Sequence, residues 1–140
     1  MRLQQVPDAE RPITGSLGLM KLTATVLDSP DPRALATFYH RLLDGWTLND
    51  AEDEWVTLRM PDGRPGLSFQ YEAKYARPTW PAGPGDQQMQ MHLDIEVDDL
   101  ETAVARAVEL GATVEEYQPQ KDVRVMRDPD GHVFDLWIAT

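Results

Sequence analysis

The chain repeats a short turn motif, and the distance between the two copies constrains the fold more than any other feature. The sequence RMPDG at 59–63 returns as RDPDG at 127–131, 68 positions later in a chain of 140 residues. The same shift brings Asp31 onto Asp99, and each of these aspartates stands before a stretch whose apolar residues recur at helical spacing. A repeat of about half the chain length predicts that one supersecondary unit is used twice.

The two predicted helices carry recognisable start and stop signals. In the first, Asp31 is placed to cap the N-terminus, and Pro32 occupies the first helical position, where its missing N–H costs nothing. In the second, Asp98 and Glu101 have the spacing of a capping box. A glycine follows each helical stretch, as is common where helices end.

Each predicted helix follows one strand-like run and precedes three more. These runs are 22–28, 46–50, 54–60 and 67–71 in the first half, and 91–97, 112–117, 123–127 and 133–137 in the second. The order predicts an α+β fold of two tandem βαβββ modules. Two such units placed edge to edge form one curved mixed sheet that bears a cavity, with the helices on its outer face.

The same pattern divides the chain into four parts. We expect an N-terminal arm at 1–19, a first module at 20–72, a linker rich in proline and glycine at 73–86, and a second module at 87–140. The linker contains Trp80, which is predicted to cover the cavity as a lid or to cap a crevice. The two modules together are expected to form one domain.

Composition excludes several classes of protein. The chain has no cysteine, so disulfides and thiolate chemistry are ruled out, and its net charge of −11 argues against binding to nucleic acid or to anionic membranes. No stretch resembles a signal peptide or a membrane span, which makes the cytoplasm the default location. The GPGD at 83–86 neither follows a strand nor opens a helix, so no dinucleotide cofactor is expected.

Three segments resemble the vicinal oxygen chelate superfamily, and its glyoxalase-like subgroup most closely. They are FYHRLLDGW at 38–46, MHLDIEVDDLETAVARAVELGA at 91–112 and RDPDGHVFDLW at 127–137. The superfamily includes glyoxalase I, extradiol dioxygenases, methylmalonyl-CoA epimerase, fosfomycin-resistance enzymes and bleomycin-resistance proteins. The resemblance covers residues 20–139 and implies the fold described above, whereas the fold itself hosts many reactions.

The resemblance also implies a site for a divalent metal on the first and last strands of each half. In the second half the implied ligands are His92 and Asp135, which suit Zn, Ni, Fe or Mn. The corresponding first-half positions are Ala24, which has no donor atom, and Ser68, a weak ligand for which Gln70 could substitute. Two strong ligands fall short of the three or four that protein metal sites use, so we expect no full metal site.

Strand alternation predicts which side chains face the cavity. His92 and Asp94 point away from the helix side of their strand, and Asp135 and Trp137 do so on the last strand. Trp55 alternates with apolar residues and faces the same way. Together with Ser68 and Gln70, these side chains form the predicted ligand-binding set, and tryptophans above carboxylates suit a flat or cationic organic molecule.

Simpler roles are compatible with the same residues. His92 could be a buried histidine bonded to Asp94 or Asp135, and Asp135 a partner for Arg59 or Arg127. The tryptophans of the first half, Trp46 included, could pack against the interface between the modules, whereas His132 has the wrong strand parity for the cavity and is expected to serve the turn.

Three functions follow as hypotheses. The first is a glyoxalase-like, divalent-metal-dependent lyase, isomerase or dioxygenase that uses His92 and Asp135. The second, which the loss of a ligand at Ala24 favours, is a metal-free protein that binds a small organic molecule, as bleomycin-resistance proteins do. The third is a dimerisation domain with a vestigial cavity. The resemblance further implies a homodimer, in which the arm at 1–19 could pack on the partner.

Overall fold

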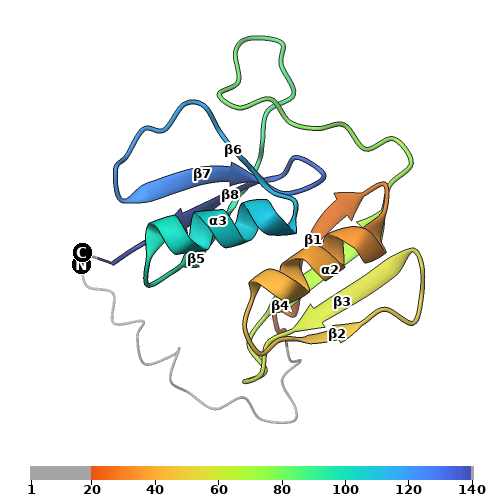
Figure 1. The fold of residues 1–140 in the computed structure, drawn as a ribbon. Coiled ribbons are helices and arrows are strands. Elements are labelled where there is room, and N and C mark those ends of the chain that lie inside the picture. The colour runs from red at the N-terminus through yellow and green to blue at the C-terminus, as the bar shows by residue number, and fades with distance from the viewer. Residues whose placement is uncertain (1–19, 140) are drawn as a thin grey trace, which may run out of the picture.

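The two halves of the protein repeat the same order of elements (Figure 1). The computed structural model describes residues 20–139, so the predicted arm at 1–19 lies outside the described residues. The first module comprises β1 (Ala24–Ser29), α2 (Pro32–Leu42), β2 (Thr47–Asn49), β3 (Trp55–Arg59) and β4 (Gly66–Tyr71). The second comprises β5 (Leu93–Glu96), α3 (Leu100–Leu110), β6 (Thr113–Val114), β7 (Val123–Arg127) and β8 (Val133–Trp137). The predicted α+β fold of two tandem βαβββ modules is confirmed, with the strands in two four-stranded sheets rather than in the single curved sheet expected.

Each module forms a four-stranded mixed sheet with the same topology. The strand orders are β1-β4-β3-β2 and β5-β8-β7-β6, and in each sheet the first pair is parallel while the others are antiparallel. Val26 pairs with Ser68 in the first sheet as Asp94 pairs with Asp135 in the second. The last strands therefore correspond at a shift of 67 rather than 68, because the chain slips by one residue after the repeated turn.

The two helices lie against each other and against the sheets. Figure 1 shows both helices in front of the strands, where α2 contacts α3 as well as β1, β2, β3 and β4. The apolar face of β3 points to this side, where Val56 and Leu58 are 0% and 1% exposed. Among residues 20–139, no helix covers the opposite faces of the two sheets, which is where the sequence places the candidate binding residues.

One hydrophobic core joins the modules. Phe38 and Tyr39 of α2 pack on Phe134 of β8, with ring centroids 6.0 and 6.1 Å apart, and Tyr39 also stacks on Phe69 of β4 at 5.8 Å. These aromatic rings are almost fully buried. Two aromatic side chains of a first-module helix thus pack on an inner strand of the second module, which joins the two sheets in one domain.

The helix starts agree with the sequence in one case and differ in the other. Asp31 caps α2 by accepting a hydrogen bond of 3.2 Å from the backbone N–H of Ala34. The predicted capping box of Asp98 and Glu101 is wrong: α3 is capped by Asp99, whose side chain accepts from the Thr102 hydroxyl instead. The true cap is the residue that matches Asp31 in the repeat.

The turn at 128–131 lies where the modules meet, and Asp128 at its start is buried. The Asp128 carboxylate, 2% exposed, accepts hydrogen bonds from the Tyr39 hydroxyl at 2.7 Å and from the backbone N–H of His132 at 3.0 Å, and it contacts the His132 ring at 2.8 Å. Ser29 donates to Asp130, and the Tyr75 hydroxyl donates to the carbonyl of Asp130 at 2.8 Å. His132 therefore serves the turn, as its parity predicted.

The linker packs on the second module. Arg127 donates to the Pro78 carbonyl at 2.6 Å and to the Trp80 carbonyl at 3.4 Å, while its guanidinium pairs with Glu115 at 2.5 Å. Trp80 lies beside Tyr117, with ring centroids 5.7 Å apart, rather than over the tryptophans of the predicted binding set. None of the described helices is long and apolar enough to cross a membrane.

Candidate functional site

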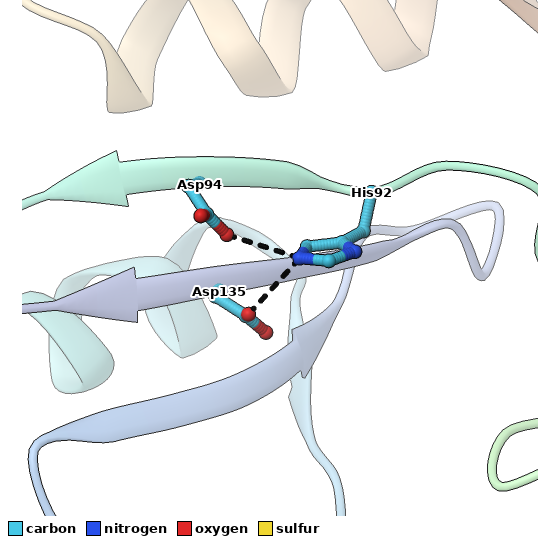
Figure 2. Close-up of side chains that lie close together, drawn as sticks. All are labelled: His92, Asp94 and Asp135. Atoms are coloured by element: carbon cyan, nitrogen blue, oxygen red, sulfur yellow. Dashed lines mark ion pairs between the residues drawn. The ribbon is translucent and has the colours of Figure 1, made fainter.

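Three polar side chains meet on the uncovered face of the second sheet. The Nε2 atom of His92 lies 3.1 Å from Oδ1 of Asp94 and 3.3 Å from Oδ2 of Asp135. Figure 2 shows both carboxylates pointing toward this one ring nitrogen. The strands explain the arrangement, because Asp94 and Asp135 are direct partners in the parallel pairing of β5 with β8. His92 stands two residues before Asp94, so the two side chains point to the same face of the sheet.

Negative charge is poorly balanced within this cluster. Burial raises the pKa of the Asp135 carboxyl, the Asp94 carboxylate raises it further, and His92 opposes the shift. No lysine or arginine among residues 20–139 forms an ion pair with either aspartate, so the imidazole is their one ionic partner. The cluster therefore has room for added positive charge.

A pocket lies directly beside the cluster. Its volume is 320 Å³, and Asp94, Gln120, Val123, Asp135, Trp137 and Ile138 line it. Trp137 stands on the same side of β8 as Asp135, two residues further on. The structure thus brings together four of the predicted residues, with the aromatic and the acidic groups at one place.

The predicted residues of the first module lie elsewhere. Trp55 and Ser68 line a separate cavity, also of 320 Å³, on the uncovered face of the first sheet. Gln70 is exposed and pairs with Trp55 across β3 and β4. Trp46 is partly buried and packs against the hydrophobic core, the simpler of the roles considered for it. The structure does not join these side chains to the His92 cluster.

The side chains of the His92 cluster match the donor chemistry of the divalent metal that the fold implies. Donor atoms of His92, Asp94 and Asp135 all lie within 4.8 Å of one another. One imidazole and two carboxylates suit ions such as Mn, Fe, Ni or Zn. The positions that correspond in the first module are Ala24, Val26 and Ser68, and they offer one hydroxyl between them. The residues fit a three-ligand site built by the second module alone.

Sequence reasoning missed two parts of this arrangement. Asp94 was predicted to bind ligand but not metal, although its spacing of two from His92 places both on one strand face. Thr57 and Arg59, which line the first-module cavity, were also missed. Their parity with Trp55 on one strand was the signal that could have found them.

Two βαβββ modules, with metal-type donors on the first and last strands of one module, define a protein of the vicinal oxygen chelate superfamily. A family model for the glyoxalase-like domain matches residues 24–137. The chain therefore belongs to the glyoxalase-like domain family.

Solved structures share this fold at low sequence identity. A glyoxalase/bleomycin resistance protein/dioxygenase family enzyme from Burkholderia phytofirmans is 16% identical, with a TM-score of 0.65 over 86% of this chain and 100% of its own. A glyoxylase/bleomycin resistance protein/dioxygenase domain from Frankia is 16% identical, with a TM-score of 0.58 over 88% and 100%. A lactoylglutathione lyase from Agrobacterium tumefaciens is 20% identical, with a TM-score of 0.55 over 84% and 92%. No curated protein matches the chain.

Proposed function

We propose that the protein binds a small, positively charged aromatic molecule on the uncovered face of the second module. The observation that carries this proposal is the convergence of the Asp94 and Asp135 carboxylates on a single imidazole nitrogen. Two carboxylates that face at most one positive charge favour a cationic guest, because a partly buried carboxylate without a counter-charge is costly.

Trp137 supplies the second element of recognition. Its side chain lines the same 320 Å³ pocket as both aspartates. An indole face attracts a cation by about 0.5–2 kcal/mol and also offers area on which a flat ring can stack. A molecule that carries its charge on an aromatic ring would use both the carboxylates and the indole.

The proposal can be tested with three probes of nearly equal shape: benzamidinium, benzamide and benzoate. Binding is followed by the indole N–H resonances in ¹H–¹⁵N spectra, with the Trp137 signal assigned from Trp137→Phe. We expect benzamidinium to move this signal at the lowest concentration. Trp137→Ala should weaken binding by about 1–3 kcal/mol, and Asp135→Asn should reduce the preference for the cation while stacking remains.

The matched control is Glu101→Gln, which removes one negative charge from helix α3 and should leave the titration unchanged. Tighter binding of benzoate at the Trp137 signal would contradict the proposal. If calorimetry showed that the Trp137→Ala protein binds benzamidinium as tightly as the unchanged protein does, that result would also contradict the proposal.

A divalent-metal-dependent lyase, isomerase or dioxygenase is the second candidate, and the 4.8 Å grouping of donor atoms favours it. His92, Asp94 and Asp135 would hold the ion. The ion, when bound, would supply Lewis-acid chemistry to an oxygen-bearing substrate. If the protein instead uses the metal-free site proposed first, we expect it to contain less than one equivalent of metal as purified and to melt at the same temperature after chelation.

Calorimetric titration of the EDTA-treated protein with Zn²⁺ or Mn²⁺ distinguishes the two candidates. A metal site requires that His92→Ala and Asp94→Asn each weaken binding and that Trp137→Ala leave it intact. A site for an organic cation requires instead that Trp137→Ala weaken the binding of benzamidinium. In that case His92→Ala should strengthen binding of benzamidinium, because it removes the ring nitrogen that both carboxylates contact.

A further inference from the structure

We infer that the first module carries a second, separate binding site, which takes a small anionic oxygen group attached to a flat ring. Aromatic carboxylates and aryl phosphates are the class of ligand that fits. The site is the 320 Å³ cavity on the uncovered face of the first sheet. Its polar and aromatic lining includes Lys21, Trp55, Thr57, Arg59, Arg64 and Ser68.

Strand alternation brings the recognition groups onto one surface. Because Val56 and Leu58 point into the core, their neighbours Trp55, Thr57 and Arg59 all point to the opposite face of β3. Thr57 therefore lies between an indole and a guanidinium along the strand. Ser68 of β4 stands directly opposite Thr57, so two hydroxyls lie side by side at the centre of this surface.

One of these hydroxyls lacks the hydrogen bond that its burial demands. The Oγ1 atom of Thr57 is buried and has no hydrogen-bond partner among the described residues. Ser68, which lines the same cavity, is only 4% exposed. A buried polar atom without a partner costs free energy, and native proteins leave few of them. A ligand oxygen in the cavity would accept the missing hydrogen bond.

The cavity is lined by positive side chains, whereas the molecule as a whole is negatively charged. The chain carries a net charge of −11, whereas Lys21, Arg59 and Arg64 all line this cavity. Arg64 pairs with Asp62 at 2.5 Å, but Arg59 and Lys21 form no ion pair with any residue in the part of the chain that the structure describes. Two basic side chains are therefore left to meet an anion.

The second module shows that the fold does not require these groups. At the positions that correspond to Trp55 and Thr57 it has Val123 and Val125. Its counterpart of Arg59 is Arg127, whose guanidinium is already engaged by Glu115. Since valine suffices where Thr57 stands, the hydroxyl serves no role that the repeated unit needs.

The experiment uses the full chain and the indole N–H resonance of Trp55, assigned from Trp55→Phe. Benzoate and phenyl phosphate are the probes, and benzamidinium is the comparison of opposite charge. Both anions should shift the Trp55 signal at millimolar concentration, and the tighter of the two identifies the anionic group. Arg59→Ala should weaken binding by about tenfold or more, the scale of a hydrogen bond to a charged group.

Thr57→Val separates a binding role from a structural one. It should raise the melting temperature, because it removes a buried unpaired hydroxyl, and weaken anion binding by about fivefold, the scale of one neutral hydrogen bond. Arg106→Ala on helix α3 removes a positive charge elsewhere and should leave binding unchanged.

Three results would overturn this inference: no response of Trp55 to either anion, equal losses from Arg59→Ala and Arg106→Ala, or a Thr57→Val protein that binds the anions with unchanged affinity. The Trp137 signal reports the other site, so failure at one site leaves the other measurable.

Discussion

The Tyr39 hydroxyl donates a hydrogen bond of 2.7 Å to Oδ2 of Asp128, across 89 positions of sequence. The two residues belong to different modules, and they are 0% and 2% exposed. Burial, together with the charge of Asp128, raises the pKa of Tyr39 well above its ordinary value. The hydroxyl therefore keeps its proton and acts as a permanent donor between the modules.

Replacing this donor should destabilise the protein. Tyr39→Phe keeps the ring that packs on Phe134 but leaves the buried carboxylate short of one hydrogen bond, at a cost of about 1–3 kcal/mol in the free energy of unfolding. Urea denaturation measures the change. Tyr117→Phe, at a side chain that is 56% exposed, is the control and should stay within about 0.5 kcal/mol of the parent. Equal stability of the two variants would show that Asp128 does not depend on Tyr39.

Replacing the two arginines of the repeated motif, Arg59 and Arg127, should have very different effects on the stability of the protein. Arg127→Ala leaves Glu115 without its partner in a setting where the two side chains are 11% and 17% exposed, and it deprives the linker carbonyls of their donor. We expect a loss of about 3–5 kcal/mol. Arg59→Ala, at the exposed position that corresponds, should change stability by less than about 0.5 kcal/mol. Thermal and urea unfolding of both variants test the contrast, and similar losses would refute it.

Stability should depend on pH through Asp135. Burial and Asp94 raise the pKa of this carboxyl in the folded protein, so folding is favoured while the group is protonated. Its destabilising effect is absent below the unfolded carboxyl pKa of about 3.9, grows as the pH rises through the folded pKa, and is constant above it. Asp135→Asn should therefore raise the melting temperature near neutral pH and reduce its decline from acid to neutral pH. A variant that is less stable at neutral pH would show that the charge is well compensated.

We expect the protein to be a homodimer in solution. Met20, Leu22 and Met91 are 93%, 74% and 73% exposed, and members of the superfamily often form dimers. Light scattering at micromolar concentration measures the mass, and a monomer would count against the expectation. Deletion of 1–19, which lie outside the described residues, tests the arm. Unchanged mass and stability would show that the arm does not contribute to the dimer interface.

The fold was predictable because its sequence signals are local and occur in both halves of the chain. The turn motif, the aspartate before each helix and the alternation of Val56 and Leu58 each report a backbone geometry that neighbouring residues determine. The repeat also contained the information needed to correct the cap of α3, since Asp99 and not Asp98 matches Asp31.

The site was predictable only within a module. His92, Asp94 and Asp135 come together because strand parity and pairing place them there. How the two modules pack is decided by side chains such as Phe38 and Phe134, whose contacts join elements far apart in sequence. For that reason no local pattern could show that Trp55 and Trp137 line different cavities, or that Tyr39 reaches Asp128.

The hydrogen bond between Tyr39 and Asp128 has no counterpart in the repeat, although the two modules share one topology. At the corresponding positions the second module has Ala107 and the first has Met60, so each half holds one partner of the bond. Two copies of the second half would bury a carboxylate without its tyrosine, and two copies of the first would have no carboxylate to accept the bond. The halves are therefore complementary at this point. We expect separately produced halves to associate with each other in preference to themselves, and a chain that repeated either half should be less stable than the natural chain by about the 1–3 kcal/mol of the lost hydrogen bond, as measured by urea denaturation.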